Sequence, residues 1–445
     1  MRYDSVCKID ECFDAFILAV EKSAAFLLPA NSAYCMQKRQ RKEQKMEGKT
    51  EPKITIVKVT QDTKIKHITN MKEGRIIVDV QPGVVLAYLD ICDILGNPNV
   101  ERLNYQSPEK DSRKYRTIDG ILYKDDKLIR CPIGRAGNIV IPEGITSIQN
   151  NAFEHCKISA VKFPKSLEYI GGYAFSYCLS LNDVDFGHGI RIISYNVFYG
   201  CIKLKEVTIP PQVLSIGDYA FASSGLRQIN LSEGIQKIGE GAFCDCLKLT
   251  EIELPNTLLK DYLNTRDGSY RIRDICLHYV NKVFVSELTD EVIHTGIFNT
   301  SEEYQTSLVE IVTPDDTFYI SKYAKTKQRL ALTSDKIKSA DFLDYEYSAS
   351  VDTGDYATVK RYLYLVEHNR KVSGKMKGRI IKRWKNIIHF LLQQNDAETL
   401  LKLIRTDLAR LDKVEYVLQE VSNVALKAYI LEELLKKDKK PDFDI

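Results

Sequence analysis

The sequence predicts an α+β protein of several domains, in which a β-rich solenoid of 22- or 23-residue coils precedes a helical repeat domain. Two observations predict this. From Asn138 to Lys260 one short pattern recurs at that spacing, and self-similarity at such a period is typical of solenoids. After Tyr347 the apolar residues change to the i, i+3, i+4 spacing of amphipathic helices.

Each copy of the pattern opens with two apolar residues at alternate positions, as in a β-strand with one buried face. An isoleucine follows, and then a small residue before a phenylalanine. The phenylalanines are Phe153, Phe175, Phe198, Phe221 and Phe243. One copy alone has too little apolar surface to bury these side chains, so we expect the copies to fold as a stack with continuous ladders inside.

This register resembles the BspA-like type of leucine-rich repeat, whose consensus runs roughly I-x-I-P-x-x-V-x-x-I-G-x-x-A-F-x-x-C. The resemblance covers about a quarter of the chain. The third copy departs from it at Gly187 and Val197, and the fourth has Ser224 in place of the cysteine. The resemblance implies a leucine-rich-repeat solenoid. It also implies an inserted β-hairpin at the D-G-x-L-Y text, which occurs here from Asp119 to Tyr123.

The chain before the clean repeats divides into two parts. Residues 1–53 combine a predicted N-terminal helix, with an apolar stripe from Asp10 to Leu28, and a charged linker. Residues 54–137 are strand-like. We expect them to form degenerate capping coils, with Val78 and Val80 as one inward pair and a hairpin inserted around Lys124-Asp125-Asp126.

The clean leucine-rich repeats occupy residues 138–260, and two further regions follow. Residues 261–346 are predicted to be an irregular β-containing connector with a turn at Pro314-Asp315-Asp316. Residues 347–445 are predicted to be helical. Two segments 41 residues apart, 354–359 and 395–400, resemble the turn inside an ankyrin-type helix pair, which makes this an ankyrin-like domain.

Composition narrows the classes of function. The formal net charge is +3, and 44% of the residues are hydrophobic. The overall composition therefore gives no reason to expect a nucleic-acid or membrane partner. The repeat cysteines share one position, where we expect reduced core thiols, although distance alone leaves a disulfide ladder open. They are Cys156, Cys178, Cys201 and Cys246. Acidic residues such as Asp4 and Asp10 interrupt the first segment, unlike a secretory signal, so we expect a cytoplasmic protein.

Signatures of catalytic chemistry are missing from the sequence. It contains no G-x-x-x-x-G-K-[ST] loop, no H-E-x-x-H and no G-x-S-x-G. The nearest approach to a metal pair is Cys244-Asp245-Cys246, and a structural zinc site needs four ligands at usable spacing. We therefore predict a protein that is not an enzyme and has no cofactor or metal.

Two surfaces are candidates for binding. The first is a row on the outer face of the repeat strands, which either docks a protein partner or is ordinary solvated surface. It comprises Lys162, Asp185, Glu206, Thr208, Asn230 and Glu253. The second is a basic patch around Trp384, which suits either phosphate contacts and base stacking or a solvated helix with Trp384 in the core. It comprises Lys375, Lys377, Arg379, Lys382, Arg383 and Lys385.

Together these observations favour a non-enzymatic scaffold for protein–protein interaction that uses the solenoid surface and has an unidentified protein partner. Two alternatives remain open. One is a secreted or surface adhesion module, because the BspA-like family includes surface proteins. The other is nucleic-acid binding through the basic helical region.

Overall fold

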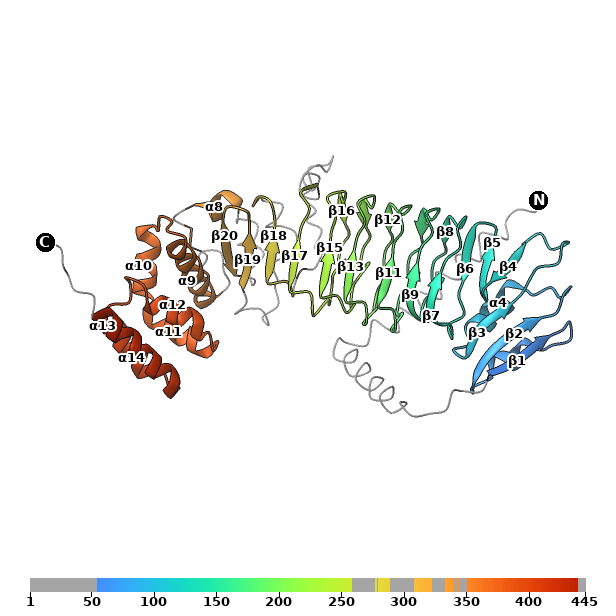
Figure 1. Cartoon of the computed structure of the whole chain (residues 1–445), viewed down its shortest axis with the longest axis horizontal. Coiled ribbons are helices and arrows are strands. Elements are labelled where there is room, and N and C mark those ends of the chain that lie inside the picture. The colour runs from blue at the N-terminus through green and yellow to red at the C-terminus, as the bar shows by residue number, and fades with distance from the viewer. Residues whose placement is uncertain are drawn as a thin grey trace. The chain divides into compact units, whose positions relative to one another are not determined.

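The computed structural model describes residues 54–257, 277, 279–288, 308–321, 333–339, 342–343 and 350–438. The predicted N-terminal helix and charged linker therefore lie outside the described residues, as do parts of the predicted connector. Figure 1 shows the course of the described elements, with the solenoid strands following one another from β6 to β20.

A small αβ unit precedes the solenoid. Its sheet has the order β1-β2-β3, with β1 at Ile54–Val59, β2 at Arg75–Val80 and β3 at Val100–Asn104. Helices α3 (Ile65–Thr69) and α4 (Tyr88–Leu95) lie between these strands in the sequence. Strands β2 and β3 pair in parallel, with Val78 beside Leu103, as two successive coils would, but a helix instead of a second short strand connects them. Of the predicted inward pair, Val78 is fully buried and Val80 is half-buried. The segment after β2 is helical because Ile91, Ile94 and Leu95 all reach the core from one side of α4.

The predicted hairpin is confirmed. Strands β5 (Ile121–Lys124) and β6 (Lys127–Arg130) are antiparallel and pair Lys124 with Lys127. The strand β4 (Tyr115–Ile118) joins them through Asp119 and Gly120, whose φ angles of 49° and 79° suit a tight two-residue turn. Because β6 also pairs in parallel with β8, the hairpin connects directly to the repeats.

Each repeat contributes one strand to each of two parallel sheets. The main sheet begins with β7 (Ala136–Val140), β9 (Lys157–Lys162), β11 (Asp183–Asp185), β13 (Glu206–Thr208), β15 (Gln228–Asn230) and β17 (Glu251–Glu253). Among the described residues its ladder hydrogen bonds join β7, β9 and β11, then β13 and β15, and begin again at β17, so the main sheet is a row of strands in three hydrogen-bonded parts. The second sheet has two-residue strands, β8 (Ser147–Ile148), β10 (Tyr169–Ile170), β12 (Ile192–Ile193), β14 (Ser215–Ile216) and β16 (Lys237–Ile238). Pairing is in register, with Ile148 beside Ile170 and Ile170 beside Ile193, so the predicted solenoid with 22- and 23-residue spacing is confirmed.

The phenylalanines form the predicted ladder. All five are 0 to 1% exposed. Successive ring centroids from Phe153 to Phe243 lie 4.7, 5.6, 5.3 and 6.1 Å apart, with ring planes within 16° of parallel. Each inner ring therefore contacts both neighbouring coils, so the burial of one coil depends on the next.

The repeat cysteines are buried free thiols. The Sγ of Cys178 donates to the Phe153 carbonyl at 3.0 Å, Cys201 to Phe175 at 3.2 Å and Cys246 to Phe221 at 3.1 Å. Burial raises the pKa of Cys201 and of Cys246 to about 12. Ser224 is buried at the same position in its own coil, 3.4 Å from the Cys246 sulfur. The position thus needs a small hydrogen-bonding side chain rather than a cross-link.

The turns between the sheets place two residues per coil in the left-handed region. One set precedes the small residue of the ladder, namely Asn151, Tyr173, Asn196, Tyr219 and Gly241. The other precedes the cysteine position, namely His155, Tyr177, Gly200, Ser223 and Asp245. A Cβ atom at Gly200 would collide with the Tyr177 ring, so this glycine permits a tyrosine of the preceding coil to pack on its backbone.

The main sheet extends beyond Lys260, which corrects the predicted boundary. Strands β18 (Lys282–Phe284) and β19 (Leu308–Val312) continue it in parallel, and β20 (Thr317–Ser321) closes it by antiparallel pairing with β19. Ile252 pairs with Val283 and Val283 with Ile311, at separations of 31 and 28 residues. These longer coils break the 22-residue period, so the sequence pattern ended before the sheet did.

The C-terminal region is helical, as predicted. Its described helices are α8 (Ser334–Lys338), α9 (Val351–Glu367), α10 (Gly374–Lys382), α11 (Trp384–Gln393), α12 (Ala397–Ile404), α13 (Leu411–Glu420) and α14 (Val424–Asp438). The turn predicted at Gly354 is wrong, because Ser350 caps α9 and Gly354 lies inside that helix, whereas Asp396 does cap α12. The two segments are therefore not equivalent, and the ankyrin-like assignment is not confirmed.

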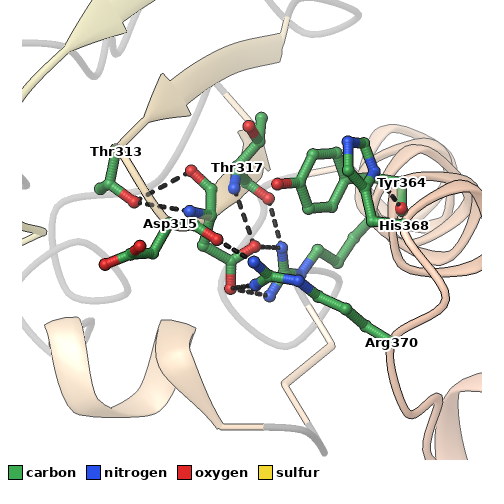
Figure 2. A network of polar contacts seen from close by, with 8 residues as sticks. Thr313, Asp315, Thr317, Tyr364, His368 and Arg370 are labelled. Atoms are coloured by element: carbon green, nitrogen blue, oxygen red, sulfur yellow. Dashed lines mark hydrogen bonds and ion pairs between the residues drawn. The ribbon is translucent and has the colours of Figure 1, made fainter.

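The end of α9 holds the last turn of the main sheet. Asp316, in the turn before β20, accepts a hydrogen bond from Arg361 Nη2 at 2.9 Å and lies 3.0 Å from Arg370 Nη1. Arg361 also lies over the Phe318 ring, 4.6 Å from its centroid. Figure 2 shows Arg370 reaching this turn beside the stacked rings of Tyr364 and His368. A polar clamp thus joins the sheet to the helices.

Candidate functional site

The predicted row lies on the outer face of the main sheet. Its six residues are all exposed, while the side chains between them, such as Val207 and Ile252, are buried. This follows from strand geometry, because successive side chains point to opposite faces. In-register pairing places Lys162 beside Asp185 and Thr208 beside Asn230. Two residues that the sequence interpretation missed, Phe284 and Val312, continue the row on β18 and β19.

Some members of the row contact each other. Lys162 Nζ lies 3.3 Å from Asp185 Oδ2, and Asn230 Nδ2 donates to Thr208 Oγ1 at 3.1 Å. The Gly187 N–H donates to Asp185 Oδ1 at 3.1 Å. This hydrogen bond, with help from Lys162, holds the pKa of Asp185 below its usual value. Asp185 therefore supports its own turn as well as lining the surface.

A second outward row runs alongside the first, two positions earlier in each strand. From β11 to β19 it comprises Asp183, Glu206, Gln228, Glu251, Lys282 and Glu310. Glu206, which the sequence interpretation placed in the first row, stands two positions before Thr208 on β13 and so belongs to the second row. Lys282 Nζ lies 3.4 Å from Glu310 Oε1. Within the described part of the chain, the carboxylates of Asp183, Glu206, Glu251 and Glu253 have no ion-pair or hydrogen-bond partner. The outer face is therefore acidic and open to solvent.

A cleft of about 510 Å³ lies where the outer face meets the helices, and we call it the junction cleft. Glu310 and Tyr319, which pair across β19 and β20, form its floor. Tyr356 and Lys360 of α9 and Asp396 at the start of α12 form a wall. The remaining lining residues are Asn281, Leu308 and Gln394. No spacing in the sequence joins these segments, so sequence reasoning missed the cleft.

Asp396 organises the helical wall of the junction cleft. Its carboxylate accepts from the Tyr356 hydroxyl and caps α12 through Thr399 N at 3.1 Å, while Lys360 Nζ lies 3.3 Å away. Burial opposes the charge, but the Thr399 and Tyr356 hydrogen bonds leave the pKa of Asp396 below its ordinary value. Burial first, and then Asp396, raises the pKa of Tyr356. The wall therefore presents a charged carboxylate beside a neutral phenol.

A smaller cavity of about 360 Å³ lies at the C-terminal ends of β17, β18 and β19. Glu253, Phe284 and Pro314 are among the residues that line it. It places an aromatic ring next to one of the unpaired carboxylates of the first row. A cavity therefore lies at each end of strands β18 and β19.

The predicted basic patch is not a free cationic surface. Arg379 Nε and Arg383 Nε each donate to Asp355 at 2.8 Å, and Asp355 is 1% exposed. Lys377 Nζ pairs with Asp407 at 2.8 Å, and Lys385 lies over the Tyr416 ring. Lys375 and Lys382 are exposed. The structure agrees with the alternative of a solvated helix face with Trp384 in the core. The sequence did not reveal the acidic partners because they lie far away along the chain.

Trp384 belongs to the core of the helical region. It is 1% exposed and its Nε1 donates to the Lys413 carbonyl at 3.3 Å. A ring in this position cannot stack on a nucleic-acid base. Nothing in the geometry of α10 and α11 supports nucleic-acid binding.

No group of three or more His, Cys, Asp or Glu in the described ranges is placed to hold a metal ion. Of the Cys244-Asp245-Cys246 pair, Cys246 is committed to the buried ladder. None of the described helices combines the length and apolarity that crossing a bilayer requires.

Comparisons with known proteins agree with the repeat register. Residues 135–250 match the BspA type leucine rich repeat region in six copies, one more than the five aligned from the sequence. Among curated proteins, none matches this chain.

Several solved structures are similar over part of the chain. A leucine rich cell surface protein from Faecalibacterium prausnitzii A2-165 is 26% identical over 44% of this chain and 46% of that one, with a TM-score of 0.33. The T. pallidum leucine rich repeat protein is 27% identical over 34% of this chain and 72% of its own length, with a TM-score of 0.28. A leucine-rich repeat protein from Bacteroides capillosus ATCC 29799 is 31% identical over 26% and 91%, with a TM-score of 0.21.

The match thus spans less than half of the Faecalibacterium protein. Strand pair, isoleucine, phenylalanine and cysteine all occupy the positions in the fold that the repeat requires. Residues 135–250 are therefore a BspA type leucine rich repeat region.

Proposed function

We propose that the protein is a non-enzymatic protein-binding module that engages a protein partner through the outer face of its main sheet. One observation carries the proposal. The strands that form the outer face follow one another coil by coil in three hydrogen-bonded groups, and the carboxylates on it that have no partner among the described residues take no part in the core or in the turns. Side chains on a rigid framework that fold stability does not require are free to be used for recognition.

We further propose that the protein works in a reducing compartment, the cytoplasm. The support is chemical, because the ladder thiols are used as hydrogen-bond donors to backbone carbonyls. Alkylation of the unfolded native protein under non-reducing conditions, followed by mass spectrometry, should label Cys178 and Cys201. A disulfide between two ladder cysteines, or recovery of the protein from the medium, would instead favour the adhesion alternative.

Site-specific photo-crosslinking tests where the partner binds. A benzophenone amino acid replaces Thr208 on the outer face or, as the matched control, Lys237 on the second sheet of the same solenoid; both positions are exposed. Irradiation in native extract, followed by mass spectrometry of the adduct, should yield a specific protein adduct at Thr208 and none at Lys237. Equal adducts at both positions, or an adduct at Lys237 alone, would contradict the proposal.

A further inference from the structure

We propose that the segment of the partner that lies on the outer face is extended and basic, and that one of its arginine side chains occupies the junction cleft. This inference rests on the proposed function, because it assigns a chemistry to the partner at the same surface. It predicts what binds there, whereas the proposed function predicts only where binding occurs.

The outer face has more negative than positive side chains. From β9 to β19 the two outward rows hold six carboxylates, Asp183, Asp185, Glu206, Glu251, Glu253 and Glu310, and two lysines, Lys162 and Lys282. Each lysine already contacts a carboxylate of its own row. The four remaining carboxylates have no partner within the described residues. Cationic side chains complement such a surface, and acidic or neutral ones do not.

Strand spacing sets the length of the segment. Hydrogen-bonded neighbouring strands lie about 4.8 Å apart. The path from Asp183 on β11 to Tyr319 on β20 takes six strand-to-strand steps, of which β11 to β13 and β15 to β17 are not hydrogen-bonded, so it covers at least roughly 29 Å. An extended chain advances about 3.3 Å per residue, so about nine residues cross the acidic part of the face. Alternate side chains of such a segment point toward the sheet, and basic residues at every second position would meet the carboxylates.

The lining of the junction cleft suits an arginine side chain. Its floor and wall offer two tyrosine rings and two carboxylates, from Tyr319, Tyr356, Glu310 and Asp396. Lys360 Nζ lies 3.3 Å from Asp396, and Lys282 Nζ lies 3.4 Å from Glu310 Oε1. Hydrogen-bond acceptors and aromatic faces therefore dominate the lining. A guanidinium group has five donors and no acceptor, and it stacks on aromatic rings, so it suits this cleft better than a compact ammonium group.

The acidic outer face leads into the junction cleft, because Glu310 belongs to both. Glu310 belongs to the second outward row, in register with Lys282 and Glu251, so the acidic row leads directly into the cleft. The helical wall blocks further progress along the sheet at Tyr356 and Lys360. A segment that follows the row therefore ends in the cleft, which fixes its register.

A labelled peptide tests the inference with the full-length protein. The probe is a fluorescein-labelled nonapeptide of alternating serine and arginine, and the matched controls replace arginine by citrulline or by lysine. Citrulline keeps the shape of arginine and removes its charge. Fluorescence anisotropy should show saturable binding of the arginine peptide and at least about tenfold weaker binding of the citrulline peptide, since several exposed ion pairs are lost together. Binding should also weaken as salt rises from 50 to 300 mM.

Two variants separate the acidic face from the junction cleft. Changing Glu206→Gln, Glu251→Gln and Glu253→Gln together should weaken the arginine and lysine peptides alike, by about tenfold. Glu310→Gln should weaken the arginine peptide about fivefold and the lysine peptide less, because only the arginine makes the paired hydrogen bonds in the cleft. Circular dichroism melting curves confirm that each variant folds.

The possible outcomes decide between the two levels of the proposal. If the citrulline peptide binds as well as the arginine peptide, or if no peptide binds at 1 mM, a basic partner is wrong. If Glu310→Gln leaves the affinity for the arginine peptide unchanged, no arginine side chain occupies the junction cleft. A specific protein adduct at Thr208, with a cross-linked segment that is not basic, would reject this inference while leaving the proposed function intact. Absence of that adduct would reject the proposed function itself.

Discussion

The solenoid and the helical region are stabilised in different ways. In the solenoid the same contact recurs in each coil, so Phe175, Phe198 and Phe221 stack on one another and the cysteines repeat one hydrogen bond. In the helical region the decisive contacts occur once. Asp355, for example, is buried between Arg379 and Arg383, which lie 24 and 28 residues later. Periodic contacts leave a trace in the sequence, and single long-range contacts leave none.

The same difference applies to charge. Four carboxylates of the outer face, Asp183, Glu206, Glu251 and Glu253, have no partner among the described residues. In contrast, Arg379 and Arg383 pair with aspartates of α9, and Lys377 pairs with Asp407 between α12 and α13. In the sequence alone, the most conspicuous cluster of charge is the basic patch around Trp384. Only the folded arrangement shows that four carboxylates without a described partner line the solenoid, while two arginines of the basic run are held by the buried Asp355. The predictions below test this contrast, beginning with the largest effect.

Loss of one ladder phenylalanine should have the largest effect. Phe198→Ala removes a ring that stacks on Phe175 and Phe221, so it should lower the free energy of unfolding by about 3 to 5 kcal/mol. Denaturant unfolding followed by circular dichroism measures the change. The control is Tyr169→Ala, which removes a ring that is 46% exposed and should cost about 0.5 kcal/mol or less. A cost below about 1 kcal/mol for Phe198→Ala would mean that the ladder is not a shared core.

A single buried carboxylate should matter nearly as much in the helical region. Asp355→Ala leaves Arg379 and Arg383 without their common acceptor, and we expect a loss of about 2 to 3 kcal/mol. The matched control is Asp352→Ala, which removes an exposed partner of Arg383 and should cost about 0.5 kcal/mol. Unfolding monitored by Trp384 fluorescence reports on this region. Equal costs for the two variants would show that the burial of Asp355 contributes nothing.

The clamp between sheet and helices should respond to acid. Burial opposes ionisation of Asp316, but hydrogen bonds and charge from Arg361 and Arg370 leave its pKa below the ordinary value. A lowered pKa in the folded state means that the stabilisation is fully present above the unfolded pKa of about 3.9 and is lost as pH falls through the folded pKa. Protease digestion at pH 6 and pH 3.5 should therefore show faster cleavage between β20 and α9 at the lower pH.

The variant Asp316→Asn provides the control for the acid response. It should weaken the clamp at pH 6 by about 1 to 2 kcal/mol and make cleavage between β20 and α9 less dependent on pH. A pH dependence identical to that of the unmodified protein would show that another group controls the junction.

Substitution of a ladder cysteine should have the smallest effect. Cys201→Ser keeps a donor for the Phe175 carbonyl, and Ser224 already occupies the equivalent position one coil later. We expect a change in unfolding free energy of no more than about 1 kcal/mol. Because burial raises the pKa of Cys201 to about 12, the native thiol should also react slowly with alkylating reagents at pH 8. Rapid labelling of the folded protein would contradict the buried ladder.

Sequence reasoning succeeded where geometry follows from spacing. Alternation along each strand placed Lys162, Thr208 and Asn230 on the outer face, and the 22-residue period placed Phe153 to Phe243 in one ladder. It failed at β18 and β19, because longer coils hide the period, and it did not foresee the short helix α4 between β2 and β3. It also missed the junction cleft, whose residues come from β19, β20, α9 and α12.

The central claim is that the free charge of the outer face, and not the basic helical region, recognises the partner. The direct test compares two charge-reversal variants in quantitative capture of the native partner. The first carries Glu206→Lys, Glu251→Lys and Glu253→Lys, and it leaves Asp185 unchanged because Asp185 supports the turn at Gly187. The second carries Lys382→Glu and Lys385→Glu, and it leaves Arg383 unchanged because Arg383 holds Asp355. Both should melt close to the unmodified protein, since exposed substitutions usually change stability by about 0.5 kcal/mol or less. The account predicts that the first variant loses the partner and the second retains it; loss of the partner by the second variant alone would contradict it.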